Sequence, residues 1–175
     1  MREPLLNLII KGYHHINSKE DFCFIEPIIS NIDWVQDADI NYRYINPSNE
    51  IDKALSKTSE LLLEKYIKHI DKCAKIGYKS IWNGTEISSC KWHNDLKEGP
   101  NICFLMYLSD IRDNCGGQIE IRRKSTKEIT GSVTPKKYDI VMFSQELEWE
   151  HRVSPFRCDS MERITTNIGF YVKWI

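Results

Sequence analysis

Alternating polar and apolar side chains in the last part of the chain constrain its fold more than any other feature. The odd positions carry Arg163, Thr165, Asn167, Gly169 and Tyr171, and the even positions carry Ile164, Thr166, Ile168, Phe170, Val172 and Trp174. Successive side chains of a strand point to opposite faces, so this pattern predicts a strand with one polar and one apolar face. With amphipathic helices upstream, we expect the apolar face to pack on them and the polar face to point into a barrel, toward a ligand. A plain sandwich strand with a solvated outer face has the same periodicity.

The rest of the second half consists of short extended runs separated by turn residues, which is typical of strands. The predicted strands are Tyr78–Trp82, Glu86–Trp92, Ile102–Leu108, Gln118–Lys124, Glu128–Val133, Tyr138–Phe143, His151–Phe156 and Ile164–Trp174. Asn83-Gly84 predicts a type I′ hairpin between the first two. Eight strands of this kind favour a jelly roll or barrel.

The first half predicts helical support for this β core. Apolar residues recur every three to four positions from Ile51 to Cys73, so we expect a helix over Asn49–Ile76 that ends at Gly77. Upstream of it, residues 19–31 predict a shorter helix interrupted by a proline, and residues 40–45 predict a strand.

Length and composition bound the class of protein. With 175 residues and 41% hydrophobic side chains, the chain has enough apolar surface for one folded domain. We expect a single domain over residues 1–175, mainly β, in which helices in 1–77 pack on one sheet of a jelly-roll core at 78–175. The formal charge of −1 removes the simplest electrostatic case for a nucleic-acid or anionic-membrane partner, so neither is expected.

The six cysteines show no C-x-x-C spacing, and the apolar run Leu5–Ile10 contains Asn7. That run is too short for a signal-peptide core, and a membrane span needs about 20 residues. We therefore expect a cytoplasmic protein whose thiols stay reduced and behave as small buried hydrophobic groups.

Two of the five histidines lie where a metal site is plausible on chemical grounds. His93 and Asp95 are two residues apart, so on an extended chain both side chains project to the same side. His151 opens a later predicted strand. Two imidazoles and one carboxylate form the facial triad of non-haem Fe(II) oxygenases, which leaves three adjacent coordination positions open. The alternatives are three surface residues that never meet, or a zinc hydrolase, since the same groups can hold zinc.

Several motifs with this triad occur in a recognisable order. They are Trp92-His93-Asn94-Asp95, Phe104-Leu105-Met106-Tyr107-Leu108-Ser109-Asp110, Gly116-Gly117-Gln118-Ile119, Pro135 with Asp139-Ile140-Val141-Met142-Phe143, and His151-Arg152-Val153-Ser154-Pro155. Over Trp82–Trp174 the chain resembles the Fe(II)- and 2-oxoglutarate-dependent dioxygenases, particularly the prolyl 4-hydroxylase-like branch. The resemblance implies a double-stranded β-helix, the jelly-roll barrel of that superfamily.

The resemblance also implies roles for residues at matching positions. It implies that His93, Asp95 and His151 are the metal ligands. It makes Arg163 the cation for the distal carboxylate of 2-oxoglutarate, because a guanidinium offers that group a planar two-pronged match. Tyr107 and Thr165 become hydroxyl donors to 2-oxoglutarate.

Other residues around these motifs have open interpretations. Arg163 follows His151 by twelve residues, a longer gap than is usual in this group, so Arg157 and Lys173 are alternative cations. Residues 145–150 form either a lid or a solvated loop. Of the neighbours Arg122 and Arg123, only one can face inward toward a substrate. His14-His15 is expected in a surface loop.

An enzyme of this superfamily uses Fe(II), 2-oxoglutarate and dioxygen, with ascorbate as a candidate reductant. Superfamily variants that halogenate lack the carboxylate of the motif, so Asp95 favours hydroxylation of an aliphatic carbon. The leading substrate is a prolyl or other side chain in a peptide or protein, and the alternative is a free amino acid or small metabolite. A barrel that serves only as a binding module is a third interpretation. Nucleic-acid repair is disfavoured by the neutral charge and by the lack of a basic groove interleaved with aromatic residues.

Overall fold

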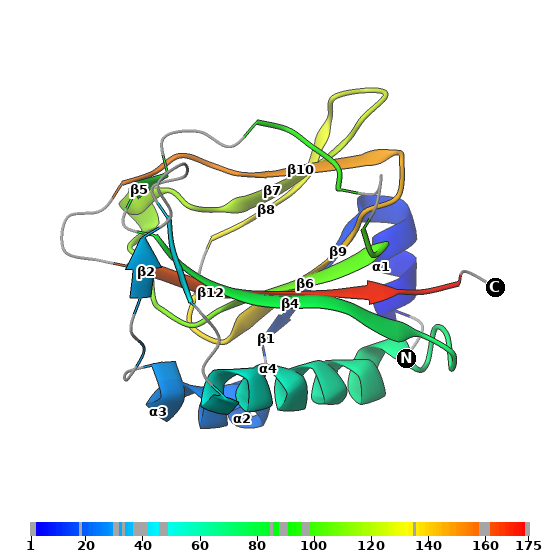
Figure 1. Cartoon of the computed structure of the whole chain (residues 1–175). Coiled ribbons are helices and arrows are strands. Elements are labelled where there is room, and N and C mark those ends of the chain that lie inside the picture. Colours follow the sequence, from blue (N-terminus) through cyan, green and yellow to red (C-terminus); the bar gives the residue numbers. More distant parts are fainter. Residues whose placement is uncertain are drawn as a thin grey trace.

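The structure is a computed structural model. It describes residues 3–17, 19–29, 32, 34–36, 42–45, 49–84, 86–87, 91–95, 99–134, 136–157 and 162–173, and the account below concerns these residues. They form three layers: a small sheet, a large sheet beneath it and a layer of helices beneath both (Figure 1).

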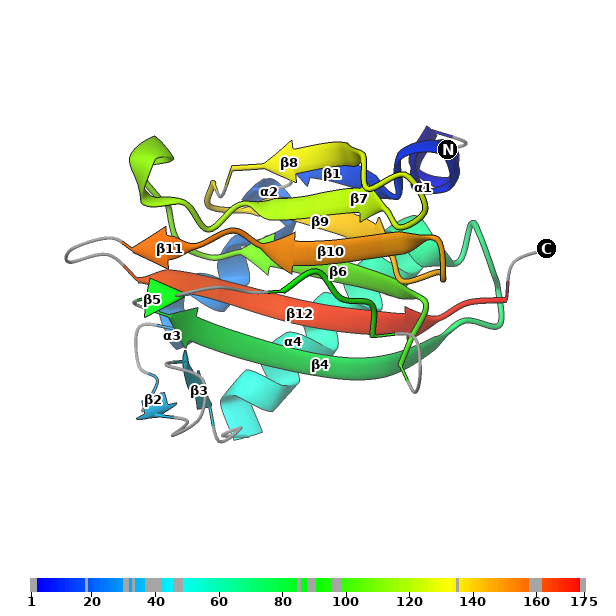
Figure 2. The same cartoon turned by 90° about the horizontal axis from the view of Figure 1, so that it is seen from above.

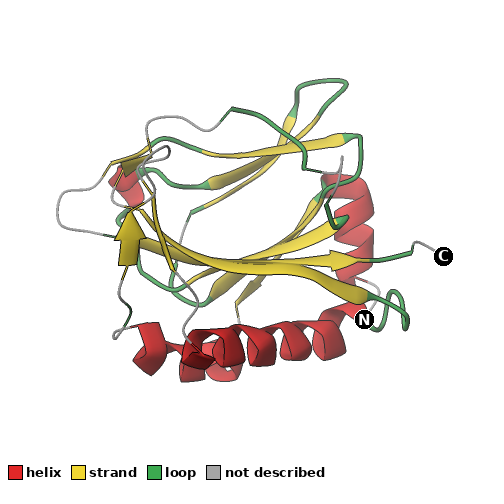
Figure 3. Ribbon diagram, in the orientation of Figure 1, coloured by secondary structure: helices red, strands yellow, loops and turns green. Residues whose placement is uncertain are grey.

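Most of the helical residues lie in the first half of the chain. The helices are α1 (Glu3–Lys11), α2 (Lys19–Phe22), α3 (Glu26–Ile29) and α4 (Asn49–Leu62), with a π-helical turn at Leu63–Ile67 and 3-10 turns at Cys23–Ile25 and Asp113–Cys115. Figure 3 shows α2, α3 and α4 along one face of the large sheet, as predicted for the helical support.

The strands form two facing antiparallel sheets and a short strand pair. The large sheet has the order β1 (Tyr13–Asn17), β9 (Asp139–Ser144), β6 (Ile102–Tyr107), β12 (Arg163–Tyr171), β4 (Lys75–Gly84), β3 (Tyr42–Ile45) and β2 (Trp34–Gln36). The small sheet has the order β10 (Trp149–Val153), β7 (Ile119–Arg123) and β8 (Ile129–Val133), and β11 (Phe156–Arg157) pairs with β5 (Glu86–Ile87). Figure 2 shows the small sheet lying over the large one. This arrangement confirms the predicted double-stranded β-helix.

Two apolar cores lie on either side of the large sheet. Even-numbered strand residues such as Phe104 and Phe170 belong to a cluster with helical side chains such as Leu55. Odd-numbered residues of β6 such as Leu105 belong to a second cluster with Ile121 of the small sheet. Strands β6 and β9 are buried on both faces, which explains why each reads as a continuous apolar run.

The two-faced character predicted for the last strand is confirmed. On β12, Ile168 and Phe170 pack in the core that includes the helices, whereas Arg163, Thr165 and Asn167 line a pocket between the sheets. The chain therefore presents its polar face to the interior of the barrel.

The helix predicted over Asn49–Ile76 is too long. Helical structure ends with the π-helical turn, and β4 begins at Lys75, so Gly77 lies inside a strand. Nine residues of β12 pair with β4 from Lys75 onward, and this long-range pairing outweighs the helical spacing of the apolar residues. The Asp71 carboxylate, which accepts main-chain hydrogen bonds from Cys73 and Lys173 at 2.8 Å each, holds the turn before β4.

The hairpin predicted at Asn83-Gly84 is wrong. Both residues belong to β4, where Gly84 pairs with Arg163 on one side and Tyr42 on the other. The next strand, β5, pairs with β11 and not with β4. Strand partners on both sides override the turn preference of the dipeptide.

Two N-terminal elements, α1 and β1, were not predicted from the sequence. His14 and His15 lie in β1, at the edge of the large sheet, and not in a surface loop. The His15 Nε2 atom lies 2.9 Å from Oδ2 of the buried Asp139 on β9. The apolar run at the N-terminus forms α1, and no helix among the described residues combines the length and apolar character needed to cross a membrane.

The expectation of reduced cysteines is wrong for one residue. Cys115 is buried and disulfide-bonded. Cys73 and Cys103 carry free thiols. A disulfide formed by tertiary proximity, without a C-x-x-C motif, has no local signal in the sequence.

Candidate metal centre

Three side chains from two distant parts of the chain meet at one point. His93 and Asp95 follow β5, and His151 lies in β10; ligand atoms of all three lie within 4.8 Å of one another. His93 Nε2 lies 3.7 Å from Asp95 Oδ1, and His151 Nε2 lies 3.7 Å from Asp95 Oδ2. The structure thus brings together the three residues that the sequence singled out.

Main-chain hydrogen bonds hold the two histidines side by side. The His93 N–H donates to the His151 carbonyl at 3.1 Å, and the His151 N–H donates to the His93 carbonyl at 2.9 Å. Their ring centroids are 4.3 Å apart. Residues paired in this way present their side chains on the same face, so both imidazoles reach one ion.

Each imidazole is oriented as a ligand. His93 Nδ1 lies 2.7 Å from the Lys91 carbonyl, which can only accept, so Nδ1 carries the hydrogen and Nε2 keeps its lone pair for a metal. His151 is 8% exposed. Its burial, with a smaller contribution from His93, lowers the pKa of His151 to about 4 against the opposing effect of Asp95. The imidazole of His151 is therefore neutral at pH 7, as metal binding requires.

A pocket of about 250 Å³ opens at the three side chains and extends between the sheets. Its polar wall comes from β12, through Arg163, Thr165 and Asn167, and its apolar wall includes Leu105, Ile119 and Phe143. Trp82 on β4 also lines it. The polar face of β12 therefore lines the same pocket as His93, Asp95 and His151.

Arg163 is a buried cation without a counter-ion in the described part of the chain. It is 3% exposed; its Nε donates to the Gly117 carbonyl at 3.2 Å, and its Nη2 has no hydrogen-bond partner among those residues. Removing a charge from water without compensation costs several kcal/mol. A carboxylate in the pocket would supply the missing charge and the planar match.

The other two residues assigned to 2-oxoglutarate lie beside Arg163. Tyr107 on β6 and Thr165 on β12 are register partners, and both are buried. The Arg163 guanidinium carbon is 5.2 Å from the centre of the Tyr107 ring, and the Tyr107 hydroxyl has no hydrogen-bond partner among the described residues. Burial raises the pKa of Tyr107, so the hydroxyl stays protonated as a donor. A dicarboxylate therefore fits the donor groups that this end of the pocket offers.

The alternative cations lie elsewhere. Arg157 and Lys173 are exposed and do not line the pocket, and the main-chain N–H of Lys173 donates to Asp71. The short strand β11 takes up part of the long gap between His151 and Arg163. Of the three candidate cations, Arg163 lines the pocket and the other two do not.

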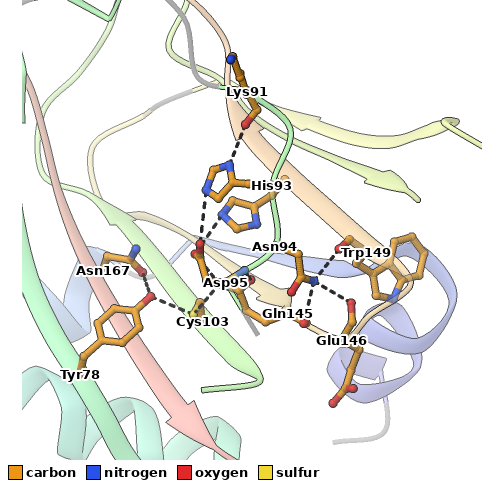
Figure 4. Close-up of polar contacts among 11 residues, drawn as sticks. Tyr78, Lys91, His93, Asn94, Asp95, Cys103, Gln145, Glu146, Trp149 and Asn167 are labelled. Carbon is orange, nitrogen blue, oxygen red and sulfur yellow. Dashed lines mark hydrogen bonds and ion pairs between the residues drawn. The ribbon is translucent and has the colours of Figure 1, made fainter. Parts of the chain in front are cut away.

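Residues 145–150 include a solvated turn, in which Leu147 is 71% exposed and Glu148 is also exposed, between two buried residues. Gln145 and Trp149 are 1% and 2% exposed, and Trp149 already belongs to β10. The Asn94 amide donates to the carbonyls of Gln145, Glu146 and Trp149 at 2.7 to 2.9 Å (Figure 4). Asn94, the residue between His93 and Asp95, thus holds this segment next to the site.

Neither Arg122 nor Arg123 faces the pocket. The Arg122 guanidinium pairs with Glu150 at 2.7 Å and lies over the Trp92 ring at 4.3 Å, on the outer face of the small sheet. Arg123 lies over the ring of Trp149 at 4.7 Å. A contact with a substrate in the pocket is therefore not supported for either residue, because Arg122 pairs with Glu150 and Arg123, two residues after the inward-facing Ile121, packs against Trp149 away from the pocket.

A chain of polar groups that the sequence did not reveal runs from the pocket wall to Asp95 (Figure 4). The Tyr78 hydroxyl donates to Asn167 Oδ1 at 3.2 Å and lies 3.1 Å from Cys103 Sγ, which accepts from Gln145 Nε2 at 3.3 Å. Burial raises the pKa of Cys103 to about 11, so the thiol stays protonated. No motif marks these residues, because their contacts depend on which strands lie next to each other.

Solved structures of similar fold include HygX from Streptomyces hygroscopicus with nickel and 2-oxoglutarate bound. HygX is 14% identical, with a TM-score of 0.76, over 99% of this chain and 87% of that chain. A prolyl-4-hydroxylase from Pseudomonas putida is 15% identical, with a TM-score of 0.66, over 98% and 93%. A prolyl hydroxylase from Trichoplax adhaerens, in complex with a hypoxia inducible factor peptide fragment, is 14% identical, with a TM-score of 0.69, over 97% and 87%. At these identities the likeness shows the fold.

A comparison with curated proteins finds no significant match. The family model described as the 2OG-Fe(II) oxygenase superfamily, however, matches residues 63–171, which is more than half of the chain. That span includes all three clustered side chains and the buried Arg163. The chain belongs to the 2-oxoglutarate- and Fe(II)-dependent oxygenase superfamily.

Proposed function

We propose that this oxygenase hydroxylates an aliphatic carbon, with His93, Asp95 and His151 as iron ligands and Arg163, Tyr107 and Thr165 as the 2-oxoglutarate site. One observation carries the proposal: the three ligand groups meet at a pocket in which a buried guanidinium has no counter-ion among the described residues. A metal position and a carboxylate position thus share one cavity.

In this proposal, the side chains of the protein position and protect the metal and the co-substrates. When bound, Fe(II) and 2-oxoglutarate supply the oxidising chemistry that activates dioxygen. His93, Asp95 and His151 would supply three ligands to the metal and leave its remaining positions to the co-substrates. Arg163 and Tyr107 would hold the distal carboxylate, beside the apolar wall to which Leu105 and Phe143 contribute.

The leading substrate is a prolyl or other side chain of a peptide or protein. In support, the structures of similar fold include several named as prolyl hydroxylases, and one of them is in complex with a peptide fragment. A small molecule is the second candidate, because HygX, crystallised with hygromycin B, has a TM-score of 0.76 to this chain. Both candidates use the same metal and 2-oxoglutarate groups.

Visible spectroscopy of anaerobic protein with Fe(II) and 2-oxoglutarate tests the proposed site. We expect the weak charge-transfer band of the ternary complex in the wild type, and its loss in His93→Ala. Arg163→Ala is expected to raise the 2-oxoglutarate concentration at which the band reaches half of its full intensity. No band in intact wild-type protein would refute the proposed site.

Succinate formation separates the two substrate classes. Peptide panels that contain proline are compared with free amino acids and small metabolites, with mass spectrometry for the gain of one oxygen. Stimulation by peptides alone supports the leading class, and stimulation by small molecules alone overturns it.

A further inference from the structure

We propose that Gln145 is a positioning residue that holds Asp95 in the orientation needed to bind the metal. This inference rests on the proposed function, in which Asp95 is a ligand. It assigns to a buried amide a role that neither the sequence motif nor the triad itself contains.

Gln145 makes two hydrogen bonds to Asp95. Its Oε1 accepts the main-chain N–H of Asp95 at 3.1 Å, and its Nε2 donates to Asp95 Oδ2 at 3.1 Å (Figure 4). One contact fixes the backbone of the ligand, and the other fixes the rotation of its carboxylate. A single amide therefore controls both the position and the direction of the carboxylate.

The amide is itself held in place. Gln145 is 1% exposed and directly follows β9; its N–H donates to the Asn101 carbonyl at 2.9 Å, and its carbonyl accepts from Asn94 at 2.8 Å. The Nε2 group also donates to Cys103 Sγ at 3.3 Å. Backbone and side chain are thus anchored independently of any metal.

Asp95 lacks comparable support from its own segment. Its side chain is 48% exposed, and the residue lies outside the strands. An exposed carboxylate without a fixed partner samples several rotamers, and ordering it on metal binding costs free energy. Contact with a buried, anchored amide lowers that cost before the metal arrives.

The amide also influences which oxygen faces the metal. Each carboxylate oxygen of Asp95 lies 3.7 Å from one imidazole, Oδ1 from His93 Nε2 and Oδ2 from His151 Nε2. The hydrogen bond from Gln145 is made to Oδ2, so it leaves Oδ1 as the stronger donor to a metal. One-oxygen binding by Asp95 would leave three positions for the co-substrates. Because the amide is neutral, it orients Asp95 without adding a second negative charge.

The test measures Ni(II) binding to the metal-free protein by isothermal titration calorimetry. Gln145→Met keeps the length of the side chain and removes both hydrogen bonds, and Gln145→Asn keeps an amide too short to reach both points. Ser144→Ala is the matched control: it removes a neighbouring buried hydroxyl, which accepts from the Glu146 N–H and does not contact Asp95. Thermal unfolding of each metal-free variant is measured alongside.

We expect both Gln145 variants to bind Ni(II) about 10- to 100-fold more weakly than the wild type, the range typical for groups that orient metal ligands. Ser144→Ala should bind like the wild type, even where its melting temperature falls. Binding by Gln145→Met within threefold of the wild type would overturn the inference, as would an equal loss in Ser144→Ala. Absence of Ni(II) binding in the wild type would instead refute the proposed metal site.

Discussion

Replacing Arg163 with methionine should change stability and co-substrate binding in opposite directions. Methionine has a similar length but no charge, and it suits a side chain that is 3% exposed. In the metal-free protein, the guanidinium has no counter-ion among the described residues, so its removal relieves an uncompensated burial. In the loaded protein, the same change removes the cation that we assign to 2-oxoglutarate.

The contacts of Arg163 set the expected magnitudes. Relief of the buried charge is worth several kcal/mol, and loss of the Nε hydrogen bond leaves the Gly117 carbonyl unsatisfied at a cost of about 1–3 kcal/mol. The net change is a gain of about 1–3 kcal/mol in the free energy of unfolding. Leaving a bound carboxylate without its partner costs about 2–5 kcal/mol, which is about a 30- to 5,000-fold weaker affinity for 2-oxoglutarate.

Two assays measure these effects separately. Urea unfolding of the metal-free proteins gives the stability, and calorimetric titration of Ni(II)-loaded protein with 2-oxoglutarate gives the affinity. Arg163→Lys is the control that keeps a charge and loses the planar fork, so its affinity should fall between the other two. A metal-free Arg163→Met protein destabilised by more than about 2 kcal/mol would refute the argument from buried charge. An unchanged affinity for 2-oxoglutarate would refute the assigned role.

Three further predictions concern the fold and the site. Because burial lowers the pKa of His151 to about 4, below the ordinary value of 6.5, the unfolded chain takes up this proton first. The metal-free protein should therefore lose up to about 3 kcal/mol as the pH falls from 6.5 toward 4, measured by urea unfolding, with a flatter profile in His151→Gln; identical profiles would contradict the assignment. Gly116 has φ +78°, and an added Cβ would lie 1.8 Å from the Pro155 carbonyl oxygen, so Gly116→Ala should cost at least about 2 kcal/mol by the same assay. Phe104 is fully buried with its ring centre 5.5 Å from that of Phe170, so Phe104→Ala should lower stability by about 3–5 kcal/mol, and a loss under 1 kcal/mol would show that the core rearranges to fill the space.

Much of the β core was predictable because strand periodicity is a local property. The runs assigned to β6, β7, β8 and β9 match the structure to within one or two residues at most ends. Errors arose where a distant partner decided the outcome. Lys75 and Ile76 fall within the predicted helix but pair with β12, and Asn83-Gly84 look like a turn but have strand partners on both sides.

In the candidate site, too, some features follow from local geometry and others depend on tertiary contacts. The spacing of His93 and Asp95 places both side chains on one side of an extended segment, whatever the rest of the chain does. Alternation along β12 likewise sends Arg163 and Thr165 to the same face. These relations follow from the geometry of neighbouring residues, so the sequence alone was enough to identify them.

The sequence by itself therefore determined the class of fold, the chemical identity of the three clustered side chains and the face on which Arg163 lies. Only the tertiary structure decided that the two histidines pair through their main chains, that Gln145 grips Asp95 and that Cys115 is disulfide-bonded. The physical reason is that periodicity and short spacings are set by the backbone geometry of adjacent residues. Contacts between residues 50 or more positions apart depend instead on the order and register of the strands that carry them.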